Sequence, residues 1–204
     1  MTRHDSPDAA RRRFFAAALR VCGDKGFAAT RMADIADAAG RSKGALYHHF
    51  ATKQELFIEL LHMLVDELST EVDEGMLGER PAHELVERTM ISVVEGFGGS
   101  DLFRVLVELM PAAARDPDLR VPLMRYYAQA LQTCTTLIRW GQRRGELRPD
   151  IDARRVARAL VMGGHGIYLV GTALGEVDQS VDDVRQLYAR ILDGVRSPKT
   201  ETDP

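Results

Sequence analysis

The stretch Thr30-Arg-Met-Ala-Asp-Ile-Ala-Asp-Ala-Ala-Gly-Arg-Ser-Lys-Gly-Ala-Leu-Tyr-His-His-Phe-Ala-Thr-Lys53 decides the fold of this chain. It predicts a helix capped by its opening threonine, a tight turn at Gly40, and a second short helix capped by Ser42. In the second helix Leu46 and Phe50 lie four residues apart, so one face is apolar and the others are rich in hydrogen-bond donors. Two helices joined by a short turn with Gly are typical of the helix-turn-helix, whose second helix enters the DNA major groove.

The chain has 204 residues, which is long enough for a proper hydrophobic core, and its formal net charge is −3. Cys22 and Cys134 stand apart in apolar helical patterns, so we expect two buried free thiols in a reducing compartment. The polar start of the chain does not resemble a signal peptide. We therefore expect a cytoplasmic protein, and we predict no metal and no cofactor.

Charge is divided unevenly along the chain. Residues 1–55 carry ten Lys/Arg and six Asp/Glu (10 − 6 = +4), whereas the remainder carries 17 and 24 (17 − 24 = −7). A basic segment attached to an acidic body is expected where only one end meets phosphates. Chance clustering of charge on solvated faces remains an alternative.

The rest of the chain shows helical periodicity, with no strand-like alternation and no internal repeat. Thr52-Lys-Gln-Glu55 is a capping-box pattern, which predicts a firm helix start at the edge of the helix-turn-helix. The expected fold is all-α with about nine helices. The predicted domains are a three-helix DNA-binding domain at residues 1–52, a ligand-binding and dimerisation domain at 53–195, and a disordered tail at 196–204. The expected later helices are Thr52–Asp73, Pro81 to about Gly96, Ser100–Met110, Pro117–Arg144, Asp152–Leu174 and Ser180–Gly194.

With these motifs in place, the sequence resembles the TetR family of transcriptional regulators. The residues that carry the resemblance are Gly26-Phe27, Thr30, Asp34-Ile35-Ala36, Ala39-Gly40, Ser42-Lys43-Gly44, Leu46-Tyr47, His49-Phe50, Lys53 and Glu55-Leu56-Phe57. One departure is Arg41, where the family usually has an apolar turn residue. The resemblance implies a homodimer that places one recognition helix in each half of a palindromic double-stranded DNA operator.

The residues expected to bind DNA combine this resemblance with their chemistry. Lys43 and Lys53 supply positive charge, Gly44 and Ala45 have too little bulk to hold the helix away from the groove, and Tyr47 matches a family position commonly on the backbone. Lys53 matches a phosphate-binding lysine of the family. The full predicted set is Thr30, Arg41, Ser42, Lys43, Gly44, Ala45, Tyr47, His48, His49 and Lys53.

The resemblance also assigns the last two long helices to dimerisation. Four glycines within Asp152–Leu174 each cost about 1 kcal/mol relative to alanine in a helix, and the close approach of another helix can compensate. A membrane span is the alternative, but Arg158 and Glu176 leave too short an apolar run. The predicted dimerisation residues are Val156, Leu160, Gly164, Gly171, Val184, Leu187, Tyr188 and Ile191.

The resemblance also implies a ligand cavity between the middle helices. Met and aromatic side chains there suit varied apolar ligands, while His165, Tyr127 and Glu108 offer polar contacts. The predicted ligand-binding residues are Met90, Phe97, Phe103, Val107, Met110, Met124, Tyr127, Leu131, Trp140, His165 and Tyr168. For each of them plain core packing is the alternative; for His165 it is a core histidine bonded to a backbone carbonyl.

The expected function is a sequence-specific repressor released from DNA by a small apolar effector. One alternative is a DNA-binding accessory or architectural protein without an inducer, which a well-filled core at Met90, Phe103 and Trp140 would favour. An enzyme is the second alternative, but the sequence has no P-loop, HExxH or GxSxG motif, so we predict no enzymatic activity. The effector, the operator and the choice between repression and activation are not encoded in any motif.

Overall fold

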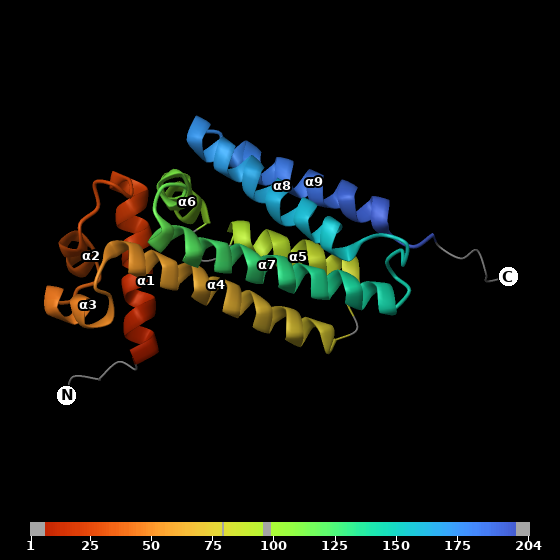
Figure 1. Cartoon of the computed structure of the whole chain (residues 1–204), viewed down its shortest axis with the longest axis horizontal. Helices are drawn as coiled ribbons and strands as arrows, with labels where there is room; N and C mark the ends of the chain where they lie inside the picture. Colours follow the sequence, from red (N-terminus) through yellow and green to blue (C-terminus); the bar gives the residue numbers. More distant parts are fainter. Residues whose placement is uncertain (1–6, 79, 96–98, 199–204) are drawn as a thin grey trace.

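A computed structural model describes residues 7–78, 80–95 and 99–198, and within these ranges it contains nine helices and no strand (Figure 1). This confirms the predicted all-α fold. The helices are α1 (Pro7–Lys25), α2 (Met32–Ala38), α3 (Lys43–His49), α4 (Lys53–Met76), α5 (Ala82–Glu95), α6 (Gly99–Ala113), α7 (Pro117–Arg143), α8 (Ala153–Leu174) and α9 (Val177–Val195).

The helices gather into a small N-terminal unit and a longer body. α2 and α3 lie at one end of the molecule, next to the start of α4, while α4 and α7 run away from them and α8 and α9 lie side by side on one flank (Figure 1). The first turns of α4 bury Leu56, Phe57 and Leu60, and the Phe57 ring meets Phe27 at 5.4 Å between centroids. As expected, α4 contributes to the core of both units.

Three helix boundaries differ from the prediction. α4 continues through Gly75, because a Cβ there would lie 2.5 Å from Leu85 Cδ1, so this glycine admits α5 and does not end the helix. α6 passes through Pro111 and ends at Ala113. α9 begins at Val177, so Ser180 lies inside its first turns and donates its hydroxyl to Glu176 O at 2.8 Å.

The C-terminal segment is partly ordered. Arg148 N donates to Val195 O at 2.9 Å and Ser197 N donates to Glu146 O at 3.0 Å, so the chain end pairs with the loop between α7 and α8. The predicted disorder is therefore wrong for residues 196–198. Residues 199–204 lie outside the described part of the chain.

Three of the four glycines of α8 serve a contact within the chain. A Cβ at Gly164 would lie 1.8 Å from Tyr188 Oη, and one at Gly171 would lie 1.6 Å from Ser180 Oγ, both on α9. The approaching helix is therefore α9 of the same chain.

In the described part of the chain, no helix is long and apolar enough to span a membrane.

This packing determines how far the predicted dimerisation residues are exposed on one chain. Five of the eight are buried inside the chain, because the apolar face of α8 turns toward α7 and α9, and that of α9 turns toward α8 and α5. These five are Leu160, Gly164, Gly171, Val184 and Tyr188. The other three, Val156, Leu187 and Ile191, are half-buried.

Candidate DNA-binding site

The turn between α2 and α3 is tight. Gly40 has φ +64°, its N–H donates to Asp37 O at 3.1 Å, and Arg41 N donates to Ala36 O at 3.0 Å. These two bonds form a Schellman motif, in which a left-handed glycine lets the chain satisfy the last carbonyls of a helix. The unusual Arg41 does not loosen the turn, because only its backbone enters the motif.

Helix α3 presents the polar face that the sequence predicts. Ser42 is its N-cap and accepts the Ala45 N–H at 3.2 Å, while Leu46 and Phe50 are fully buried. Tyr47 is 54% exposed. The other exposed residues of the predicted DNA-binding set are Arg41, Ser42, Lys43, Gly44 and His48, and Ala45 is half-buried.

Three predicted DNA-binding residues are placed differently. Thr30 is 2% exposed and does not cap α2; its hydroxyl donates to Gly26 O at 2.8 Å, and α2 begins after Arg31. His49 is half-buried, with its ring 5.7 Å from that of Phe14. Lys53 directs its ammonium to backbone carbonyls of the loop between α1 and α2, including Thr30 O at 2.8 Å.

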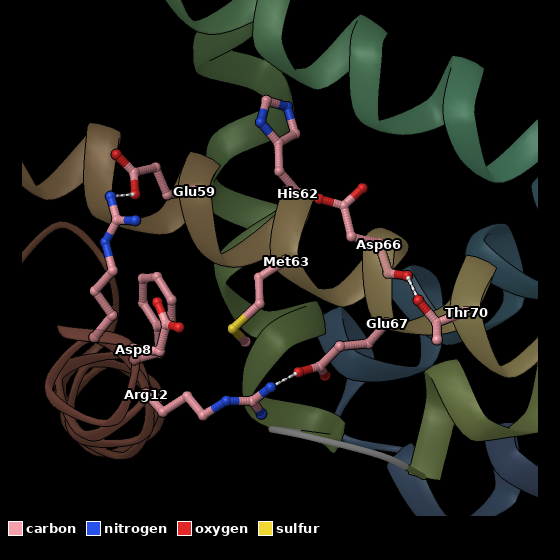
Figure 2. A pocket seen from close by; sticks show the side chains of 10 residues that line it. Asp8, Arg12, Glu59, His62, Met63, Asp66, Glu67 and Thr70 are labelled. Atoms are coloured by element: carbon pink, nitrogen blue, oxygen red, sulfur yellow. Dashed lines mark hydrogen bonds and ion pairs between the residues drawn. The ribbon is translucent and has the colours of Figure 1, made fainter. Parts of the chain in front are cut away.

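The junction of α1 and α4 holds a surface pocket of about 430 Å³ (Figure 2). Ion pairs cross it at two places: Arg11 Nη2 lies 2.7 Å from Glu59 Oε2, and Arg12 pairs with Glu67. Arg11 and Arg12 are thus turned toward the body. Because all four side chains remain substantially exposed, each pair contributes at most about 1 kcal/mol.

The body contains an aromatic cluster where the sequence predicts the ligand cavity. The Phe103 ring lies 4.3 Å from Tyr168 and 5.4 Å from His165, and the Tyr127 ring lies 5.3 Å from His165. Tyr126, which was not among the predicted residues, belongs to this cluster. It could have been found by extending the buried stripe of α7 through Leu119, Leu123, Tyr126 and Ala130.

The buried polar groups of this cluster satisfy one another. His165 Nδ1 lies 2.7 Å from Val161 O. Since a carbonyl only accepts, Nδ1 of the neutral ring carries the proton and Nε2 accepts the Tyr126 hydroxyl at 3.2 Å. Burial lowers the pKa of His165, against a smaller opposing effect of the Val161 bond. The residue that suggested a ligand contact is therefore a neutral core histidine in this structure.

Other predicted ligand-binding residues divide between core and surface. Met90 and Leu131 are buried and Val107 is half-buried, whereas Met110 and Met124 are 40% and 63% exposed, so these two do not line the interior. Trp140 is half-buried, and the Arg144 guanidinium lies 4.6 Å from the centroid of its ring. Phe97 falls outside the described residues.

Glu108 does not face the cluster. Its two carboxylate oxygens accept the backbone N–H groups of Phe27 and Ala28 at 2.9 and 2.8 Å. No sequence pattern signals this contact, because it joins residues about 80 positions apart.

Comparisons with known proteins agree with this arrangement. The family model described as bacterial regulatory proteins of the tetR family matches residues 14–60, and the model described as a Tetracyclin repressor-like C-terminal domain matches residues 83–184. The regulator CymR of Pseudomonas putida is 34% identical over 113 residues, which span 55% of this chain and 55% of CymR. The regulator UidR of Escherichia coli is 26% identical over 157 residues, which span 77% of this chain and 79% of UidR.

Solved structures give the same result over nearly the whole chain. A TetR-family regulator from Rhodococcus sp. is 26% identical with a TM-score of 0.72, covering 92% of this chain and 98% of its own. The TetR regulator tylp of Streptomyces fradiae is 27% identical with a TM-score of 0.73, covering 95% of this chain and 90% of its own. Together with the exposed face of α3, these matches show that the chain belongs to the TetR family of helix-turn-helix transcriptional regulators.

Proposed function

We propose that this protein is a homodimeric repressor that reads a palindromic operator with α3 and is released by a small, largely apolar effector. Gly44 is the observation that carries the DNA-reading half of this proposal. A glycine is unfavourable inside a helix, yet a Cβ at Gly44 would meet only Ser42 Oγ, at 4.0 Å. Since the chain's own packing does not require the glycine, a close external surface explains it.

Selection from a randomised duplex library, followed by a gel shift, tests DNA binding. We expect a palindrome whose half-sites lie about one helical turn, roughly 34–36 Å, apart. Gly44→Leu should retain the thermal stability of the wild type and lose at least about tenfold in affinity, because the side chain would hold α3 away from the base edges. A Gly44→Leu variant that binds the selected duplex like the wild type would contradict this use of α3.

Dimerisation through the outer face of α8 is part of the proposal. Met162, Val170 and Leu174 are 40%, 58% and 67% exposed, and they follow one another with Gly166 at intervals of four residues. Val170→Glu should therefore produce monomers in analytical ultracentrifugation. Leu77→Glu is the matched control, because Leu77 is 90% exposed and lies in the loop after α4; a dimer that survives Val170→Glu as well as Leu77→Glu would rule out this face.

The effector half of the proposal depends on whether the aromatic cluster can open. Phe103 and Met90 are buried and the polar atoms of His165 are satisfied, which favours the second candidate, a DNA-binding regulator without an inducer. A ligand can release DNA only if it binds better to a state with altered spacing of the recognition helices.

A thermal-shift screen with apolar compounds, followed by gel-shift release of the selected duplex, separates these candidates. A repressor with an effector should yield compounds that both raise the melting temperature and weaken DNA binding. Compounds that stabilise the protein and leave DNA affinity unchanged would favour the regulator without an inducer.

A further inference from the structure

The loop between α1 and α2 is held on its carbonyl side by the first residue of α4. The Lys53 ammonium contacts the carbonyl oxygens of Phe27, of Ala28 at 3.4 Å and of Thr30 at 2.8 Å, and it lies 4.3 Å from the centroid of the Phe27 ring. An ammonium has three N–H donors, and three carbonyls surround this one. Lys53 therefore has no donor left for a phosphate unless a loop contact is broken.

The same loop is held on its N–H side by α6. Glu108 Oε1 accepts the Phe27 N–H at 2.9 Å and Oε2 accepts the Ala28 N–H at 2.8 Å. Gly26 precedes these residues with φ +81°, and a Cβ there would lie 3.1 Å from Glu108 Oε1. One turn earlier on α6, Arg104 Nη1 donates to Gly23 O at 3.0 Å, so α6 holds both the end of α1 and the loop that follows it.

We propose that Lys53 and Glu108 are positioning residues for DNA binding, which clamp the loop at residues 26–30 from opposite sides and orient the helix-turn-helix on the body. Lys53 then acts through the loop and not on a phosphate. The loop leads directly into α2, and the tight turn after α2 fixes α3, so a change in the loop is carried to the recognition helix. Partial burial also lowers the pKa of Lys53, as expected for a partly desolvated ammonium.

Glu108 gives a test in which two explanations predict opposite signs. Removing a negative charge ordinarily strengthens DNA binding, because the protein repels phosphates less. The clamp predicts the reverse: Glu108→Gln should bind the selected duplex roughly three- to tenfold more weakly, as expected for the loss of an ordering hydrogen bond. Glu108→Asp, which keeps the charge but shortens the side chain, should weaken binding as well.

Glu84 supplies the matched control. It is an exposed carboxylate near the start of α5, and Glu84→Gln should bind DNA as tightly as the wild type or slightly more tightly. If Glu108→Gln binds as tightly as Glu84→Gln, the clamp is refuted.

Lys53 is tested by the salt dependence of binding. A lysine that neutralises one phosphate per protomer would make the slope of log K against log salt shallower by about 1.8 in a dimer when it is removed. We expect Lys53→Met to weaken binding with little change of slope. A slope that is shallower by the full value of about 1.8 in Lys53→Met would overturn the assignment of Lys53 to the clamp. Lys43→Met is the control, because Lys43 lies at the exposed start of α3 and should show the slope change of a lysine on the DNA-facing side.

The affinity measurements rest on the proposed DNA binding, so a second measurement without DNA is needed. Hydrogen exchange of the Phe27 and Ala28 amides should accelerate in Glu108→Gln and not in Glu84→Gln. If the wild type selects no duplex, the proposed function fails, and the exchange rates still decide the clamp. Unchanged exchange in Glu108→Gln would refute the clamp whatever the DNA result.

Discussion

Replacing Gly164 by alanine should destabilise the protein by forcing α8 and α9 apart. The new methyl group would lie 1.8 Å from Tyr188 Oη and 2.7 Å from Tyr188 Cζ, and Tyr188 is only 2% exposed, so its ring has no free space to move into. Overpacking of this kind costs about 1–3 kcal/mol. The helix gains about 1 kcal/mol when glycine becomes alanine, which leaves a net loss of up to about 2 kcal/mol.

Gly194, near the end of α9, is the control glycine. A Cβ there has nothing within 4 Å in the chain, so Gly194→Ala should keep a helix gain of up to about 1 kcal/mol. Urea denaturation, with both variants at the same protomer concentration because the apparent stability of a dimer depends on it, should separate the two variants by roughly 1–3 kcal/mol.

Tyr188→Phe tests the cause of that difference. It removes the atom nearest to the new methyl group, so the double variant should recover part of the loss caused by Gly164→Ala. Equal stability of the two glycine variants, or no recovery in the double variant, would refute the α8–α9 contact as described.

Three further outcomes are expected. Burial keeps the pKa of His165 below the ordinary 6.5 in the folded protein, so the unfolded chain takes up the proton first as pH falls. This residue therefore removes up to about 1.4 kcal/mol of stability per pH unit below about pH 6.5. In urea denaturation compared at pH 7.5 and 5.5, His165→Gln should lose that part of the pH dependence, and an unchanged pH dependence would contradict the reasoning. Tyr47→Phe should weaken binding to the selected duplex about tenfold through the loss of one backbone hydrogen bond per protomer, with an unchanged melting temperature because Tyr47 is 54% exposed; wild-type affinity would exclude that bond. Glu67→Gln, which breaks the exposed pair with Arg12, should change stability by less than about 1 kcal/mol and by still less in 1 M salt, and a salt-independent loss measured by urea denaturation would contradict the assignment.

Local features of the DNA-binding unit could be predicted from the sequence. The cap at Ser42, the left-handed Gly40 and the buried pair Leu46 and Phe50 all appear in the structure. Each depends on residues within a few positions of one another, where hydrogen-bond geometry and helical spacing leave few alternatives. The same holds for Thr52, whose hydroxyl accepts the Glu55 N–H at 3.0 Å.

The packing of the body depends on which helices lie next to each other, and the helical periodicity of the sequence does not show which ones do. A run of glycines indicates that some backbone approaches, but the sequence does not distinguish α9 of the same chain from a helix of a second copy. The start of α9 differs from the prediction for a related reason. Ser180-x-x-Asp183 matches a capping box, yet Gly175 adopts φ +79° and lets the helix begin earlier, at Val177. Ser180 then packs against Gly171.

Lys53 shows most clearly which contacts the sequence alone does not predict. Its charge and its place at the start of α4 suit a phosphate ligand, and nothing nearby in the sequence competes for it. The competitors are carbonyls 23 to 26 residues earlier, which lie within reach because the loop after α1 crosses the start of α4. Residue type thus determines that an ammonium must be satisfied by acceptors, while the path of the chain determines which acceptors are near. A lysine assigned to DNA by its charge and its family position can therefore serve DNA binding indirectly, by fixing the loop that orients the recognition helix.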